Sequence, residues 1–511
     1  IKTFYYLSNI RTNIKNIYMM DIPIIIISFN NHRYVKNTIN QLESLNPTMM
    51  SNIIIMDNNS SDVDTINYLT KTKHKVVRNT VNKGPWIEHY PDIYKSLPNQ
   101  FIITDPDLEF NRDLPKNFIE IMSNLSNRFG CHKIGFALDI SDFDQMYSAI
   151  YYFNSTIYDW EKKFWNNKID DVDFELYHAT IDTTFCLINK QASKDASYKQ
   201  MRIAGNFTAK HLPWYRKNLF YNEYEKYIYG INSFSNSSTM SKLFLTYIND
   251  NYSIINKNDE KFLINNSIIE NLDFWKNIYP AWEPNTFAVF DKYLQKDKVF
   301  IDIGSWIGTT SMYGCRKSKH VYSIEADNLS IKDLSLNLSN NCINNNYTVI
   351  NKAVFSKDNA TINFGKNMFM KESRMNDSTS QIHNKNLDYS IQVKTITIDS
   401  ILNNHNIKPS SISLIKVDIE GGEENILNDL YYLYKNHKVP IYISMHYEWW
   451  KDNNLNRFSF LTQKNKDYIK NNPFADLLFT GSDIEIHTKK NKLNNIKNNK
   501  FLLSFKNLFK Q

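Results

Sequence analysis

One segment restricts the possible folds more than any other. The apolar run Val299–Ile303 leads into a glycine turn, Gly304–Gly308, and a helical pattern follows. An apolar strand, a glycine turn and a helix in this order are typical of the first unit of an α/β domain. A similar strand-then-helix pattern opens at Ile22–Ser28. Because 511 residues exceed what one hydrophobic core usually supports, the sequence predicts two α/β domains.

The downstream glycine turn is typical of a nucleotide-type ligand site. Ligands bind beyond the carboxyl ends of parallel strands, and glycine lets the backbone approach them closely. The next predicted strand, Val321–Glu325, ends in a carboxylate that can accept hydrogen bonds from both ribose hydroxyls. A dinucleotide site needs G-x-G-x-x-G, whereas here Trp306 fills the region of the pyrophosphate. The pattern favours S-adenosylmethionine, with an ordinary tight turn as the alternative.

Motifs downstream of the turn resemble the FkbM family of methyltransferases. The match covers roughly residues 286–450 and depends on D-I-G-S-W-I-G, S-I-E, N-K-A-V, T-I-D-S and I-K-V-D-I-E-G-G-E. The resemblance implies a Rossmann-like class I methyltransferase fold and O-methylation, commonly of a sugar or small-molecule hydroxyl. It implies that Asp302, Gly304 and Glu325 contact the methyl donor and that Lys416, Asp418 and Glu420 lie at the reacting end. The expected cofactor-binding residues are Asp302, Gly304, Ser305, Gly308 and Glu325.

The fourth predicted strand carries the candidate catalytic residues. Alternate residues of a strand share one face, so Lys416, Asp418 and Glu420 can converge on one pocket. Methyl transfer to a hydroxyl needs a base near the acceptor and little else, because the sulfonium is already activated. Asp418 is our first choice for this base. Glu420 can instead cap the following helix, and His446 is a second candidate base that can equally be structural.

In the upstream domain, two aspartates directly follow a short apolar strand in Phe101–Glu109. Asp105 and Asp107 can jointly hold a hard divalent ion, Mn²⁺ or Mg²⁺, which neutralises a diphosphate leaving group. Two close aspartates in a turn can also merely cap backbone amides. The D-x-D pair is therefore a candidate metal site whose meaning depends on its surroundings.

Those surroundings resemble a GT-A glycosyltransferase of the family-2-like type over about residues 20–230. The resemblance depends on Ile22–Ser28, Asn52–Ser60, Asn79–Gly84, Ile181–Phe185 and Arg202–Trp214. It implies a nucleotide-sugar donor, a carbohydrate acceptor and a divalent metal ion, while an inverting or a retaining outcome stays open. The expected residues are Asp57, Asn82 and Asp105 for the nucleotide sugar, Asp105, Asp107 and His211 for the metal, and Asp182 as the base. A loop histidine packed beside Pro213 and Trp214 is the alternative for His211.

Charge and cysteine content bear on partners and compartment. The net charge is +7, and residues 461–511 contain ten lysines against four acids. A solvated lysine-rich face is the common explanation, so no nucleic acid is expected. Four cysteines without C-x-x-C spacing argue against a zinc site or a disulfide framework and suit a reducing cytosol. No apolar run is long enough to span a bilayer and no secretory signal is visible, so we expect a cytoplasmic protein.

The predicted organisation is an extension (1–19), a GT-A nucleotide-sugar-binding domain (20–248), a helical linker (249–285) and an FkbM-like methyltransferase domain with a basic C-terminal segment (286–511). The predicted function is sugar transfer together with O-methylation of a sugar hydroxyl. This combination resembles glycan-building enzymes of large DNA viruses, which would place the protein in the host cytoplasm. The alternatives are an RNA ribose methyltransferase with a non-catalytic N-terminal binding domain, and a protein whose first domain only presents glycans.

Overall fold

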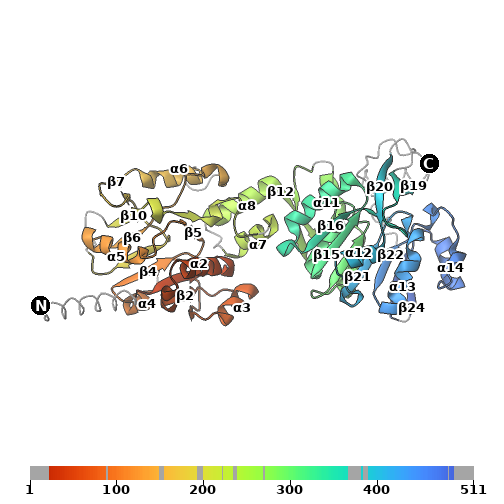
Figure 1. Cartoon of the computed structure of the whole chain (residues 1–511), viewed down its shortest axis with the longest axis horizontal. Coiled ribbons are helices and arrows are strands. Elements are labelled where there is room, and N and C mark those ends of the chain that lie inside the picture. Colours follow the sequence, from red (N-terminus) through yellow and green to blue (C-terminus); the bar gives the residue numbers. More distant parts are fainter. Residues whose placement is uncertain are drawn as a thin grey trace. The chain divides into compact units, whose positions relative to one another are not determined.

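The chain divides into two compact units, which are described one at a time (Figure 1). The first comprises Ile1–Phe220 and Glu225–Asp250, and the second comprises Tyr221–Tyr224 and Asn251–Gln511. The computed structural model describes residues 22–87, 90–148, 155–192, 199–220, 222–233, 239–268, 271–365, 381–383, 390–481 and 483–487. The predicted N-terminal extension and the basic segment beyond residue 487 lie outside these residues. Both units are mixed α/β structures, which confirms the predicted fold class.

The first unit is built on a sheet with nine described strands in the order β3-β2-β1-β4-β9-β6-β10-β8-β7. The first four of these strands run parallel, and β9 runs antiparallel between β4 and β6. All five residues of β1 are buried, as expected for a parallel strand covered on both faces. The strands are β1 (Ile24–Ser28), β2 (Ile53–Asp57), β3 (Lys75–Arg78), β4 (Gln100–Thr104), β6 (Lys133–Phe136), β7 (Lys168–Ile169), β8 (Leu176–His178), β9 (Cys186–Asn189) and β10 (Gln200–Ile203).

Helix ends in this unit follow ordinary capping rules. Asp62 caps the helix after β2 by accepting the backbone N–H of Thr65, and Gly130 ends a later helix in the left-handed region with φ 62°. The described helices are α2 (His32–Leu45), α3 (Val63–Lys71), α4 (Pro91–Ser96), α5 (Phe118–Phe129), α6 (Ile157–Lys162), α7 (Glu223–Ser233) and α8 (Thr239–Asn251).

A short ribbon brings the D-x-D segment beside a later motif. Strand β5 (Leu108–Phe110) pairs antiparallel with β11 (Ala209–His211), and Leu108 lies opposite His211. In addition, the backbone N–H of Leu212 donates to the carbonyl of Asp107 at 2.9 Å. Residues about a hundred positions apart in the chain thus meet beyond the end of β4.

The second unit contains a seven-stranded sheet in the order β16-β15-β14-β21-β22-β23-β24, as far as the described residues show. The first five strands in this order are parallel, and β23 and β24 are antiparallel additions. The chain order reverses between β14 and β21, which is where open α/β sheets bind ligands. The strands are β14 (Val299–Ile303), β15 (His320–Glu325), β16 (Tyr347–Asn351), β21 (Ile412–Val417), β22 (Ile441–Ser444), β23 (Asp476–Thr480) and β24 (Asp483–His487).

Two further elements of this unit have no counterpart in the sequence prediction. A four-stranded sheet is inserted between β16 and β21, and it consists of β17 (Ala353–Val354), β18 (Thr361–Gly365), β19 (Gln381–His383) and β20 (Ser390–Ile396). The first part of the predicted helical linker forms a hairpin of β12 (Tyr252–Lys257) and β13 (Glu260–Asn265), which turns at Asn258 with φ 51°, whereas its second part contains the predicted helical turns at Phe274–Ile278 and Tyr279–Ala281. Its buried side chains, including Phe262 and Ile264, join the core of the second unit. The helices are α9 (Pro284–Tyr293), α10 (Thr309–Lys317), α11 (Asn328–Asn341), α12 (Ile398–Asn404), α13 (Leu427–His437) and α14 (Gln463–Asn471).

The cysteine prediction was wrong in one respect, because Cys315 and Cys342 form a disulfide. Cys315 lies in α10 and Cys342 directly follows α11, and their Cα atoms are 5.4 Å apart. A disulfide depends on this spatial separation, which sequence spacing does not reveal. Cys131 and Cys186 are buried and are not disulfide-bonded. Within the described residues, no helix combines the length and apolar character needed to cross a bilayer.

Candidate functional site

A pocket opens at the reversal point of the second unit's sheet. Its floor includes the turn after β14, and its walls include residues that follow β15, β16, β21 and β22. Of the residues predicted to act in this domain, the structure places the following in the pocket lining: Gly304, Glu325, Lys416, Asp418, Glu420 and His446. Asp302, Ser305 and Gly308 were also predicted to bind the cofactor, but they are not among the lining residues.

Gly304 is required by the neighbouring strand. It has φ 80°, and a Cβ atom at this position would lie 1.8 Å from the backbone oxygen of Asp418. Its own carbonyl accepts a hydrogen bond from Nζ of Lys416 at 2.7 Å. From the sequence, this glycine was predicted to allow close approach of a ligand. The structure instead shows that the chain leaving β21 occupies the space of the missing side chain.

Glu325 presents its carboxylate at the opposite side of the same turn. One oxygen accepts the backbone N–H of Trp306 and the other accepts that of Asp327, each at 2.8 Å. Burial raises the pKa of Glu325 to about 7, although these backbone donors partly oppose the shift. Because each carboxylate oxygen has a second lone pair, Glu325 can still accept two hydroxyl groups from a ligand in the pocket.

Asp302 lies beneath the turn and is fully buried. Its carboxylate accepts the hydroxyl groups of Thr310 at 2.7 Å and Ser311 at 2.5 Å, and Nζ of Lys416 lies 3.1 Å away. Ser305 is also buried and donates to the carbonyl of Asp302. Burial alone would lower the pKa of Lys416, but nearby carboxylates, Asp302 first, raise it above its ordinary value. Asp302 therefore anchors the turn through Lys416.

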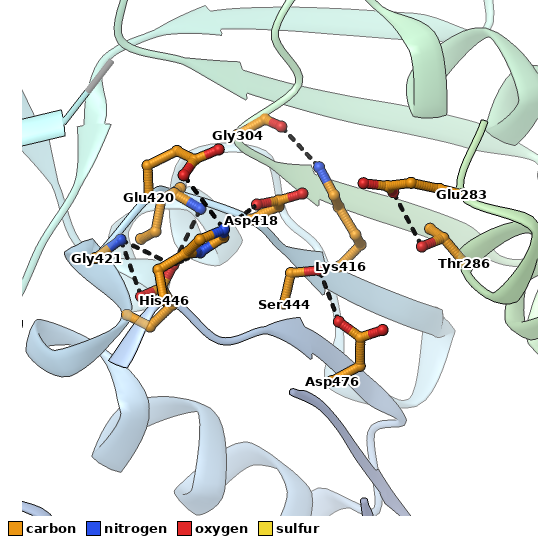
Figure 2. A network of polar contacts seen from close by, with 12 residues as sticks. Glu283, Thr286, Gly304, Lys416, Asp418, Glu420, Gly421, Ser444, His446 and Asp476 are labelled. Carbon is orange, nitrogen blue, oxygen red and sulfur yellow. Dashed lines mark hydrogen bonds and ion pairs between the residues drawn. The ribbon is translucent and has the colours of Figure 1, made fainter. Parts of the chain in front are cut away.

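His446 faces three carboxylates, and Figure 2 shows two of them, those of Asp418 and Glu420, beside its ring. Its Nε2 lies 3.2 Å from Glu420 and 3.7 Å from Asp418, and its Nδ1 lies 3.0 Å from Glu423. Burial would lower its pKa, but Glu420, Glu423 and Asp418 raise it to about 9. The ring is therefore a cation at neutral pH in the absence of another ligand, which favours Asp418 over His446 as a base.

Glu423 is a site residue that the sequence argument missed. It is fully buried, and it accepts the backbone N–H of Gly421 and the indole N–H of Trp450 as well as facing His446. The ring of Trp449 stacks on that of His446 with centroids 5.1 Å apart. The only signal in the sequence was the last acid of E-G-G-E. An acid after a strand end can be assigned to the site only once its partner in space, here His446, is known.

In the first unit, the structure brings Asp107 and His211 together. Nε2 of His211 lies 3.5 Å from Oδ2 of Asp107, and both side chains are mostly buried. The His211 ring also packs on Trp214 at 4.8 Å, as the structural alternative for this residue predicts. Asp105 is buried nearby, where burial first and Asp107 second raise its pKa well above the ordinary value. It lines a small pocket with Lys133 and Asp182.

The three residues predicted to hold a metal ion in the first unit lie near one another without forming a compact three-ligand cluster, and their metal assignment stays a prediction. Asp105, Asp107 and His211 do not bring three ligand atoms within 4.8 Å of one another. The backbone N–H of Asp105 donates to the carbonyl of Thr183 at 2.8 Å, whereas Asp107 directly precedes the β5–β11 ribbon. Within the described residues, one cluster meets that limit: Asp418, Glu420 and His446 of the second unit.

The other predicted residues of the first unit are held in local turns. Asp57 is fully buried, accepts the hydroxyl of Ser60 at 2.5 Å and lies 3.2 Å from Nε of Arg78. Asn82 is exposed and accepts the backbone N–H of the glycine two residues on. Lys133 was not predicted from the sequence. It is a buried lysine of β6 whose Nζ donates to the carbonyl of Asp182 at 2.7 Å.

Residues 299–470 match the profile of the methyltransferase FkbM domain. The second unit contains a methyltransferase domain of this type. It is an enzyme domain, and it implies S-adenosylmethionine as the methyl donor, which the carboxylate of Glu325 and the adjoining pocket fit. A comparison with curated proteins gave no match.

The matches among solved structures share little sequence with this chain and have low TM-scores. An FkbM methyltransferase from Methylobacillus flagellatus KT is 16% identical with a TM-score of 0.19, over 43% of this chain and 48% of that one. A mannosyltransferase from Pyrobaculum calidifontis, solved with GDP-Man and Mn²⁺, is 8% identical with a TM-score of 0.25, over 44% and 68%. Glucosyl-3-phosphoglycerate synthase from Mycobacterium tuberculosis is 15% identical with a TM-score of 0.20, over 24% and 46%. The chain thus spans about half the length of two of these three proteins.

Glu325 is expected to make methyl-donor binding depend on pH. Ribose hydroxyls donate to the ionised carboxylate, and this group has a pKa of about 7 in the free protein. Affinity for S-adenosylmethionine should therefore fall below neutral pH, by at most about tenfold for each pH unit. Calorimetric Kd values between about pH 5.5 and 8.5 measure this.

Two variants separate Glu325 from other titrations. Glu325→Gln should bind S-adenosylmethionine more weakly, and its affinity should no longer fall below neutral pH. Any pH dependence that remains in this variant would come from other groups, such as the amino group of the donor. Glu448→Gln changes an exposed glutamate of the same unit and should keep the wild-type profile. A wild-type affinity that is flat across this range would contradict the prediction.

Proposed function

We propose that this chain is a bifunctional glycan-modifying enzyme. Its second unit methylates a sugar hydroxyl with S-adenosylmethionine, and its first unit transfers a sugar from a nucleotide-sugar donor. The observation that carries the proposal is the pocket of the second unit, which places Glu325 and Asp418 on two sides of the Gly304 turn. Glu325 fits the ribose of the methyl donor, and Asp418 fits the acceptor hydroxyl.

In methyl transfer, this chain's own residues orient the reactants and accept a proton. Lys416 holds the turn by binding the carbonyl of Gly304 and the carboxylate of Asp302. Asp418 takes the proton of the acceptor hydroxyl while the oxygen of that hydroxyl bonds to the methyl carbon. The sulfur–carbon bond of the donor breaks at the same time, and its electron pair stays on sulfur. The sulfonium supplies the activated methyl group, so positioning and a nearby base suffice.

For sugar transfer, the support comes from the edge of the first unit's sheet beyond β4. Asp107 and His211 meet there, and Oδ1 of Asp107 is a buried atom without a hydrogen-bond partner. A divalent ion held by Asp107 and His211, with Asp105 adjacent, would supply charge for a diphosphate leaving group. Lys133 lies beside Asp105 in the small pocket and can add a positive charge on that side. Asp182 at the rim of that pocket is the proposed base for the acceptor.

One experiment tests both activities in the same chain. The full-length protein is incubated with Mn²⁺ and a panel of nucleotide sugars, and donor hydrolysis and S-adenosylmethionine binding are both measured. Asp105→Asn combined with Asp107→Asn should lower sugar-donor turnover at least about 100-fold and leave methyl-donor binding unchanged. Glu325→Gln should do the reverse. Asp113→Asn, a change at an exposed aspartate of the same region, is the matched control.

The outcomes separate the two halves of the proposal. If the wild type turns over no nucleotide sugar and the double variant binds nucleotides unchanged, sugar transfer is wrong and methyl transfer stands by itself. If methyl transfer occurs on RNA and on no carbohydrate acceptor, the glycan assignment is wrong. Binding to RNA would then also weaken steeply as salt increases.

A further inference from the structure

A second chemical feature lies inside the methyl-transfer pocket. Asp418 and Glu420 follow β21, His446 follows β22, and one ligand atom from each lies within 4.8 Å of the other two. Figure 2 shows these three side chains pointing toward one another. All three residues also line the pocket, so the cluster faces the space in which the reactants would lie.

The histidine is held as metal-ligating histidines usually are. Its Nδ1 faces the carboxylate of Glu423 at 3.0 Å, so Nε2 is directed toward Asp418 and Glu420. A carboxylate behind the ring fixes its orientation and makes the free nitrogen a better ligand. Glu423 is itself fixed by the backbone N–H of Gly421 at 3.1 Å. The ligand set therefore has a buried support that an incidental surface cluster lacks.

The charges around the cluster are unbalanced. Three carboxylates surround one imidazole, and Lys416 on the same strand is already held by Asp302 and the carbonyl of Gly304. In addition, Oδ1 of Asp418 is a buried atom that has no hydrogen-bond partner. Buried carboxylate oxygens are normally paired, so this atom has unused capacity for a cation.

We propose that Asp418, Glu420 and His446 hold a divalent cation of the Mn²⁺ or Mg²⁺ class, which binds the acceptor hydroxyl. The inference deepens the proposed methyl transfer and rests on it. Two carboxylates and one imidazole suit Mn²⁺ in particular, because it accepts both oxygen and nitrogen ligands. Three protein ligands leave coordination positions open toward the pocket, as catalytic metal sites require.

With such a cation bound, some atoms of the cluster would bind the metal ion and another would accept the acceptor proton. A cation held by Asp418, Glu420 and His446 would displace the proton on Nε2 of His446 to solvent, and one carboxylate oxygen of Asp418 would stay available for the acceptor proton. The acceptor oxygen then loses its proton to this carboxylate oxygen, forms the new bond to the methyl carbon, and the sulfur retains the electron pair of the broken bond. A bound cation lowers the pKa of the coordinated hydroxyl, so a weak carboxylate base suffices.

Manganese binding to the full-length protein tests the site. The number of bound Mn²⁺ ions is measured by electron paramagnetic resonance in the Asp105→Asn/Asp107→Asn background, which removes the candidate site of the first unit. Adding Glu420→Gln should remove one bound ion or raise its Kd at least about tenfold. Adding Glu448→Gln, at an exposed glutamate near His446, should leave it unchanged. His446→Gln serves as the second test variant, and circular dichroism verifies that each variant is folded.

A second readout places the ion and separates this inference from the proposed function. S-adenosylmethionine labelled with ¹³C in its methyl group should bind all folded variants, and Mn²⁺ should broaden the methyl signal in the Glu448→Gln protein and leave it sharp in Glu420→Gln. If the donor binds but the Mn²⁺ count and the broadening are the same in both variants, the cation site is wrong. If the wild type does not bind the donor, the proposed methyl transfer itself is wrong.

Discussion

Gly304→Ala should abolish methyl-donor binding, with a Kd at least about 100-fold higher than that of the wild type. The reason is steric: the new Cβ would lie 1.8 Å from the backbone oxygen of Asp418, and φ at this position is 80°. Strands β14 and β21 pair directly alongside, with Asp302 opposite Lys416, so neither chain can move alone. Their separation would displace the turn, the Lys416 contact and Asp418 together. Calorimetry with S-adenosylmethionine measures the loss.

Gly481→Ala is the matched control for this prediction. Gly481 has φ 59°, but nothing lies within 4 Å of the position that a Cβ would take. The alanine there bears only the cost of the left-handed backbone, about 1–2 kcal/mol, and donor binding should stay at the wild-type level. If Gly304→Ala binds the donor within about threefold of Gly481→Ala, the steric argument fails, since a 1 Å displacement is expected to cost far more.

The parts of the second unit that the sequence predicted depend on local patterns. Val299–Ile303 is a strand with the predicted bounds, and Glu325 ends the next strand, as its position after an apolar run indicated. Such patterns are readable because apolar runs and glycines act on their own neighbourhood. The roles within the turn were less predictable. The position of Asp302 in the sequence does not show whether its carboxylate contacts a ligand or the side chain of Lys416. The contact with Lys416 becomes visible only once β21 is packed beside β14.

What the sequence did not show depends on contacts between distant segments. Glu423 matters because His446 comes to lie beside it, and Lys133 matters because β6 passes beside the segment of Asp182. The Cys315–Cys342 disulfide has the same origin. In each case the chemistry depends on a distance in space that no spacing in the chain encodes. A D-x-D motif predicts two nearby carboxylates, but only the ribbon that follows brings the second one beside His211.

Lys416→Met should destabilise the second unit by about 3–5 kcal/mol, because it leaves the carboxylate of Asp302 charged and without its cation in the interior. The Lys416 side chain is 4% exposed and that of Asp302 is fully buried, so solvent screens the pair little. The neighbouring carboxylates raise the pKa of Lys416, so its contribution is present at neutral pH and is lost only in strongly alkaline solution. Urea unfolding measures the change, and the transition that shifts with added S-adenosylmethionine belongs to the second unit.

A double-mutant cycle distinguishes the lost ion pair from lost packing. Asp302→Asn in the Lys416→Met background removes the unpaired charge, so the double variant should be more stable than Lys416→Met alone by at least about 1 kcal/mol. Lys435→Met, at an exposed lysine of α13, should change the unfolding free energy by less than about 0.5 kcal/mol. If Asp302→Asn destabilises the Lys416→Met protein further, the pair does not act as a buried ion pair. The anchoring role of Asp302 beneath the turn would then have to lie in its bonds to Thr310 and Ser311.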